Sequence, residues 1–100
     1  MPATKAALRA IVRVASAELA SRKVRVNAIS PGPIDTPILG KSGLPAPAIA
    51  DFRNGVASRV PLARFGTADE VGSAAVFLAS GESSFISGSE IAVDGGLAQV

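Results

Sequence analysis

The sequence of 100 residues contains neither cysteine nor histidine. The absence of cysteine excludes disulfide bonds and thiolate metal sites, which is compatible with a cytoplasmic protein. The absence of histidine excludes an imidazole base and histidine metal ligands, so no metal site is expected. No apolar run approaches the ~20 residues of a membrane helix, and Lys5, Arg9 and Arg13 interrupt the apolar pattern of a signal peptide. We therefore expect no association with a membrane.

The formal net charge of +2 is small but unevenly distributed. Residues 1–25 carry six basic and one acidic side chain, whereas the remainder carries four basic and seven acidic ones. A basic segment can bind nucleic acid or an acidic partner, and it can equally be the solvated face of a helix. The solvated face is the simpler interpretation, so nucleic acid is not the expected partner. The basic residues are Lys5, Arg9, Arg13, Arg22, Lys23 and Arg25.

Residues 24–36, with the sequence VRVNAISPGPIDT, indicate a strand that runs into a tight loop. Apolar and polar residues alternate over 24–30, which is the period of a strand. Pro31 ends the strand because proline lacks the N–H that the ladder needs. Gly32 lets the backbone turn or approach a ligand closely, and Thr36 adds a hydroxyl group. Ligands of α/β folds bind at such carboxyl ends of strands, although an ordinary turn explains the same residues.

The other elements follow from helical periodicity, turn residues and a helix-start motif. Thr67 and Glu70 form a capping box, in which each side chain accepts from the backbone N–H of the other residue. Because this motif also suits Asp69, we interpret the carboxylates as helix-start residues and not as an acid–base pair. The predicted elements are a helix at 2–22, a strand at 24–30, a loop at 31–47, helices at 48–59 and 67–80, and a strand at 90–94.

This order of elements indicates an α/β protein with two parallel strands joined by a helical crossover. Parallel sheets are normally covered by helices on both faces and contain more than two strands. The predicted fold is therefore the C-terminal portion of a doubly wound Rossmann-type fold, forming a single partial domain over residues 1–100.

Three blocks of the sequence resemble the short-chain dehydrogenase/reductase family. They are TKAAL at 4–8, which resembles the segment around the active-site lysine, VRVNAISPGPIDT at 24–36, and the last helix and strand at 70–96, which end in VDGG. The resemblance covers essentially the whole chain, but only the C-terminal part of the family. It implies NAD(P)-dependent oxidation or reduction of an alcohol/carbonyl pair, with NAD or NADP as cofactor and a small-molecule substrate.

The resemblance also implies the roles of five residues. Lys5 matches the catalytic lysine, which holds the nicotinamide ribose and lowers the pKa of a neighbouring tyrosine through its positive charge. The nicotinamide-side loop is matched by Pro31, Gly32, Ile34 and Thr36. In that loop, Ile34 would offer its backbone N–H to the carboxamide, and Thr36 would offer its hydroxyl to the carboxamide or a phosphate.

The sequence departs from the family pattern in its catalytic acid. Met1 stands where the family has its tyrosine, and a thioether cannot transfer the proton of carbonyl reduction. The family's substrate-orienting serine and its glycine-rich pyrophosphate turn would both precede Met1. We therefore expect these residues alone to be inactive and to bind a dinucleotide weakly.

An alternative interpretation is a non-catalytic interaction or oligomerisation module. Strand 24–30 would lack one neighbour, and the exposed N–H and C=O groups of a strand edge favour pairing with another chain. We expect self-association as a dimer or a higher oligomer, with a full-length relative as a further possible partner. The candidate contacts are the helix at 2–22 and the helix and strand of 67–94.

Overall fold

A computed structural model describes residues 2–99 and divides the chain into two compact units. The first unit combines the chain up to Ser30 with Ser73–Ile91, and the second combines Pro31–Gly72 with the chain from Ala92 onwards. Both strands and the last helix contribute residues to both units.

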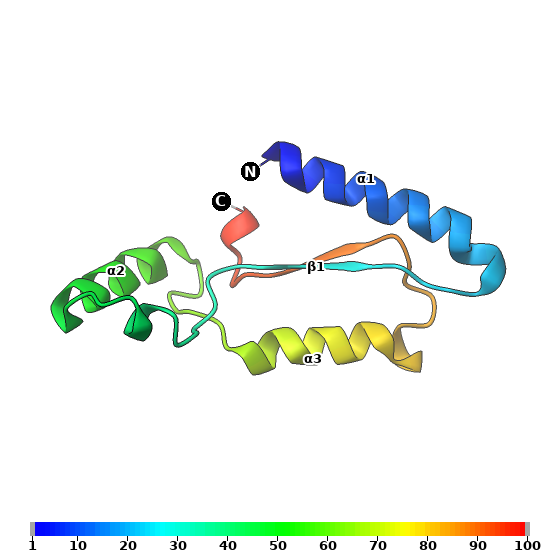
Figure 1. Cartoon of the computed structure of the whole chain (residues 1–100). Helices are drawn as coiled ribbons and strands as arrows, with labels where there is room; N and C mark the ends of the chain where they lie inside the picture. The colour runs from blue at the N-terminus through cyan, green and yellow to red at the C-terminus, as the bar shows by residue number, and fades with distance from the viewer. Residues whose placement is uncertain (1, 100) are drawn as a thin grey trace. The chain divides into compact units, whose positions relative to one another are not determined.

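The chain alternates helices with two short strands (Figure 1). The strands pair with each other in a two-stranded parallel sheet. The predicted fold class is confirmed, because this arrangement is that of a partial Rossmann-type α/β fold. No helix among residues 2–99 combines the length and hydropathy needed to cross a membrane. The helices and strands are α1 (Pro2–Leu19), β1 (Ala28–Pro31), α2 (Ala46–Arg59), α3 (Ala68–Ala79) and β2 (Glu90–Val93), with short 3-10 turns at Ala20–Arg22, Leu39–Lys41, Gly81–Ser83 and Leu97–Gln99.

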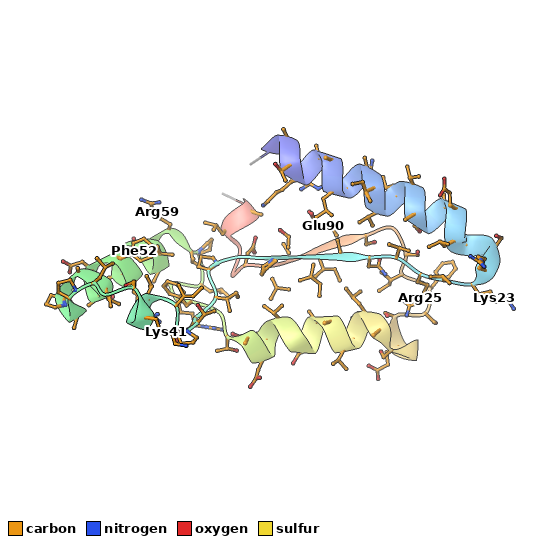
Figure 2. The ribbon with its side chains drawn as sticks, in the orientation of Figure 1. Lys23, Arg25, Lys41, Phe52, Arg59 and Glu90 are labelled. Carbon is orange, nitrogen blue, oxygen red and sulfur yellow. The ribbon has the colours of Figure 1, made fainter. Side chains whose placement is uncertain are left out.

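In the first unit, α1 and the C-terminal part of α3 lie on opposite sides of the paired strands (Figure 1). Val12 of α1 is buried, with 6% of its surface exposed. Near the middle of α1, Arg9 Nε donates to Glu90 Oε1 at 3.1 Å, and Glu90 lies between the strand and α1 in Figure 2. Near the C-terminal end of α1, the hydroxyl groups of Ser16 and Ser87 are 2.6 Å apart. Two polar contacts therefore fix α1 against the segment that contains β2.

The structure starts β1 at Ala28, later than the predicted strand at 24–30. The residues that would have to pair with 24–27, the first half of the predicted strand, form a turn instead of a strand. Val26 N donates to the hydroxyl of Ser87 at 3.2 Å, and Val26 O accepts from Gly88 N at 2.7 Å. Residues 24–27 therefore alternate as a strand would, but they do not form a complete hydrogen-bond ladder, because a ladder needs a second extended segment beside them.

Arg25 is hydrogen-bonded to the turn that follows α3. Its guanidinium group donates four hydrogen bonds of 2.9–3.1 Å, and it is half-buried. A cation beside the last carbonyl groups of a helix is favourable because the dipole is negative there. This residue therefore stabilises the end of α3 instead of contributing to a basic surface. Its acceptors are the carbonyl oxygens of Leu78, Ser80 and Ile86 and the hydroxyl of Ser83.

In the second unit, the segment after α2 packs on the segment after β2. Val60 is 3% exposed, and Leu62 N donates to Gly95 O at 3.1 Å. A Cβ atom on Gly95 would lie 2.6 Å from Val60 Cγ1, and the φ angle of Gly95 is +64°. Glycine is therefore required at this position both for its backbone conformation and for the close approach of Val60.

The capping box predicted at the start of α3 is confirmed. Thr67 N donates to Glu70 Oε1 at 2.9 Å, and Glu70 N donates to Thr67 Oγ1 at 3.2 Å. These two bonds satisfy N–H groups that the first turn of a helix cannot bond internally.

Candidate functional site

The candidate site is the loop that follows β1, and Gly32 is packed against the segment after β2. Gly32 N donates to Val93 O at 2.9 Å, which extends the pairing past the end of β1. A Cβ atom at this position would lie 2.6 Å from Asp94 Cβ and 2.8 Å from Asp94 Cα. The close neighbour that requires glycine here is therefore the protein's own Asp94. The remainder of the loop is positioned by this contact.

Ile34 is held by a parallel bridge to Gly66. Gly66 N donates to Pro33 O at 2.9 Å, and Asp35 N donates to Gly66 O at 2.8 Å. Because Gly66 makes both bonds of this bridge, the N–H of Ile34 points to the opposite side of the strand. Within the described part of the chain, this N–H makes no hydrogen bond. The loop therefore holds one backbone donor that is free within residues 2–99, the N–H of Ile34, in a fixed direction away from Gly66.

The two residues after Ile34 are both exposed. Asp35 Oδ1 accepts a hydrogen bond of 3.0 Å from Arg53 Nη1. The hydroxyl of Thr36 makes no hydrogen bond to residues 2–99, so it can donate to a ligand. A backbone N–H and a hydroxyl group thus lie two residues apart along one edge of the loop.

The structure places Pro31 at the end of β1 and Gly32, Ile34 and Thr36 in the loop that follows it, and all four belong to the second unit. Lys5 lies on α1 in the first unit, where its side chain is exposed. Among residues 2–99, no hydrogen bond or ion pair involves the ammonium group of Lys5. Met1, the position of the family's tyrosine, lies outside the described residues. The roles of these residues toward a cofactor stay predictions.

Glu70 is paired with Arg64 in addition to its capping role. The guanidinium group donates from Nη1 to Oε1 and from Nη2 to Oε2, each at 2.9 Å. These bonds, with the N–H of Thr67, lower the pKa of Glu70 from 4.5 to about 2. The same hydrogen bonds and the carboxylate charge raise the pKa of Arg64. At neutral pH, Glu70 is therefore an ionised acceptor that is already occupied, and it is unsuited to exchanging protons with a substrate.

The Arg64–Glu70 pair borders a hollow of about 190 Å³ in the second unit. Among the residues that the structure describes, no cluster of three or more His, Cys, Asp or Glu side chains could hold a metal ion. The wall of the hollow is mostly apolar, and the ion pair forms one part of it. Its remaining lining residues are Pro33, Leu62, Gly66, Val93, Asp94 and Gly95.

The sequence alone indicated no role for Arg53 or Arg64, and it placed Arg25 among the basic residues of 1–25. Two of these arginines bind acceptors that are remote in sequence, by 18 residues for Arg53 and by more than 50 for Arg25. No local sequence pattern predicts hydrogen bonds between residues so far apart. Arg64 could have been found, because it lies in the turn before α3 and precedes the capping glutamate by only six residues.

The family described as enoyl-(acyl carrier protein) reductase matches residues 1–98. A 3-oxoacyl-[acyl-carrier-protein] reductase of Thermotoga maritima is 45% identical over 95 residues, which are 95% of this chain and 36% of that protein. A cis-4-hydroxycyclohexanecarboxylate dehydrogenase of Sinomonas cyclohexanicum is 42% identical, over 98% of this chain and 37% of that protein. A glucose 1-dehydrogenase of Gluconobacter oxydans is 41% identical, over 95% of this chain and 34% of that protein.

The chain thus spans little more than a third of the length of these curated relatives. Within that span, the similarity includes both the segment around Lys5 and the loop from Pro31 to Thr36. The family match extends over nearly all of the sequence, and the structure has the α/β arrangement that the resemblance implied. The chain belongs to the short-chain dehydrogenase/reductase family.

Proposed function

We propose that this chain contributes the lysine and the nicotinamide-side loop of an oxidoreductase that interconverts an alcohol and a carbonyl with NAD or NADP. The observation that supports the proposal is the N–H of Ile34, which points away from the Gly66 bridge and makes no bond within residues 2–99. The relatives named above are a reductase of a 3-oxoacyl group and dehydrogenases of a hydroxy acid and a sugar. An alcohol/carbonyl pair is the chemistry common to these substrates.

In this proposal, the loop residues recognise the carboxamide of the nicotinamide. Ile34 donates its backbone N–H to the carboxamide oxygen, and Thr36 offers its hydroxyl to the carboxamide or a phosphate. Pro31 and Gly32 fix the start of the loop, because Gly32 is bonded to Val93 and packed on Asp94. The bound nicotinamide would supply or accept the hydride.

Lys5 has a different proposed task, on the ribose side of the nicotinamide. Its ammonium group donates hydrogen bonds to the ribose hydroxyls and favours the ionised form of a neighbouring acid. The 100 residues contain no tyrosine to serve as that acid. We therefore propose that the polypeptide, tested by itself, neither turns over substrate nor binds a dinucleotide more tightly than about millimolar, or roughly −4 kcal/mol.

The test is a titration of the isotope-labelled chain with reduced nicotinamide mononucleotide, followed by the amide resonances. We expect the resonances of Ile34 and Thr36 to shift, and we expect Thr36→Val to weaken the response by removing one donor. Ser42→Ala is the matched control, since it removes a hydroxyl in the same unit whose hydrogen-bond partners are Leu39 O and Leu44 N and not the residues of 31–36. Shifts that spare Ile34 and Thr36 would show that the loop is not the nicotinamide site.

A second candidate function, self-association, is favoured by the exposed apolar face of α1. Ile11 is 65% exposed and Val14 is 57% exposed. The two side chains border a shallow apolar hollow on one side of the helix, together with Ala10, Ala15 and Glu18. Large exposed apolar side chains in one place indicate an interaction surface more often than scattered ones do. We propose that this face pairs with a second copy of the chain or with a full-length relative.

A further inference from the structure

Arg53 of α2 makes two contacts at the edge of the candidate loop. Its Nη1 donates to Asp35 Oδ1 at 3.0 Å, and its guanidinium carbon lies 4.6 Å from the centre of the Phe65 ring. The two contacts use different parts of one group, because the N–H groups point outward in the guanidinium plane and the charge attracts the ring face. Both partners and Arg53 belong to the second unit.

These contacts fall on both sides of the bridge that holds Ile34. Asp35 directly follows Ile34 on one segment, and Phe65 directly precedes Gly66 on the other. Asp35 is thereby held twice, through its N–H by Gly66 O and through its carboxylate by Arg53. A rotation of the Ile34–Thr36 edge would have to break one of these bonds.

We propose that Arg53 is a positioning residue that holds the Ile34–Thr36 edge in the orientation that receives a nicotinamide carboxamide. The inference rests on the proposed function of the loop. Because Arg53 belongs to α2, it links the position of that helix to the donors of the loop. This coupling is reciprocal, so a ligand that orders the edge also favours the docked position of α2.

The first experiment measures amide hydrogen exchange without ligand. In Arg53→Met, which keeps an aliphatic side chain but loses the charge, exchange at the Asp35 amide, which is bonded to Gly66 O, should be roughly fivefold faster. Arg53→Lys should restore part of the protection, because it keeps a charge near Asp35 but not the planar group over Phe65. The matched control is Arg59→Met, at the last residue of α2 (Figure 2), which should leave exchange at Asp35 unchanged. Unchanged exchange in Arg53→Met would overturn the proposal.

The second experiment repeats the titration with reduced nicotinamide mononucleotide on the same variants. Arg53→Met should weaken the response at the Ile34 amide about fivefold, with partial rescue by Arg53→Lys and no change in Arg59→Met. Equal binding by wild type and Arg53→Met would contradict the positioning role. If the wild type itself gives no response at Ile34, the proposed function of the loop fails, and the exchange experiment still decides whether Arg53 holds the edge.

Discussion

Glu70 illustrates how one exposed side chain can stabilise a loop and a helix together. It accepts from Thr67 N at the start of α3 and from both terminal nitrogens of Arg64. These bonds favour the ionised carboxylate and keep its pKa near 2 in the folded state, against an ordinary value of 4.5. The stability that this group contributes is therefore complete above pH 4.5, and it is lost as the pH falls from 4.5 toward 2.

We predict that Glu70→Gln removes this part of the acid sensitivity. The variant should be less stable than wild type at pH 6, and the difference should shrink between pH 4.5 and pH 2. Urea unfolding at a series of pH values measures it, and added salt should reduce the difference because the pair is exposed. Asp69→Asn is the control for loss of a charge in the same helical turn. Parallel pH profiles for wild type and Glu70→Gln would refute the assignment.

The elements of the first unit depend on a few polar contacts because little of α1 is buried. Val12 is its buried residue among those described, and the Arg9–Glu90 pair adds a contact to β2. The Glu90 side chain is 15% exposed, and its Oε2 atom is buried without a hydrogen-bond partner in the described part of the chain. Among residues 2–99, Arg9 is the cation paired with this carboxylate, which therefore depends strongly on that contact.

We predict that Arg9→Met destabilises the chain by roughly 1–3 kcal/mol, because it leaves the Glu90 carboxylate desolvated and unpaired. The double variant Arg9→Met/Glu90→Met should recover most of this loss, since an apolar pair can occupy the same space without an unpaired charge. Chemical unfolding measures both, with Arg22→Met as the control for removing a basic residue from the same segment. A double variant less stable than Arg9→Met would show that the charge of Glu90 is itself required.

Local signals predicted the helices better than the first strand. The capping box of Thr67 and Glu70 involves residues three apart, so the sequence contains the whole motif. The start of β1 depends instead on what lies opposite residues 24–27, and a turn there cannot be read from their own alternation. The loop residues could be predicted by resemblance, but the contacts that position them could not. Arg53 reaches Asp35 across 18 residues, and only the folded chain brings the two together.

At the scale of the whole chain, burial is small for a sequence that is 48% apolar. Among the residues whose burial is described, Val12 and Val60 are the buried apolar side chains, one in each unit. The apolar side chains that stay exposed include Ile11 and Val14 on one face of α1. A small domain buries a smaller fraction of its surface than a large one and gains correspondingly little stability from its core. Association that covers the exposed face of α1 would therefore contribute a large part of the total free energy of unfolding.

We predict that the chain self-associates through this face of α1. Reburial of each large aliphatic side chain contributes about 1.5–3 kcal/mol, so Ile11→Glu should weaken a dimer by at least roughly tenfold. Light scattering and sedimentation at low micromolar concentration measure the effect. Ala6→Glu is the matched control, because Ala6 is exposed elsewhere on the same helix and a new carboxylate near the helix start is tolerated. A wild-type chain that unfolds cooperatively as a monomer at these concentrations would contradict the prediction, since it would show that α1 needs no cover beyond its own unit.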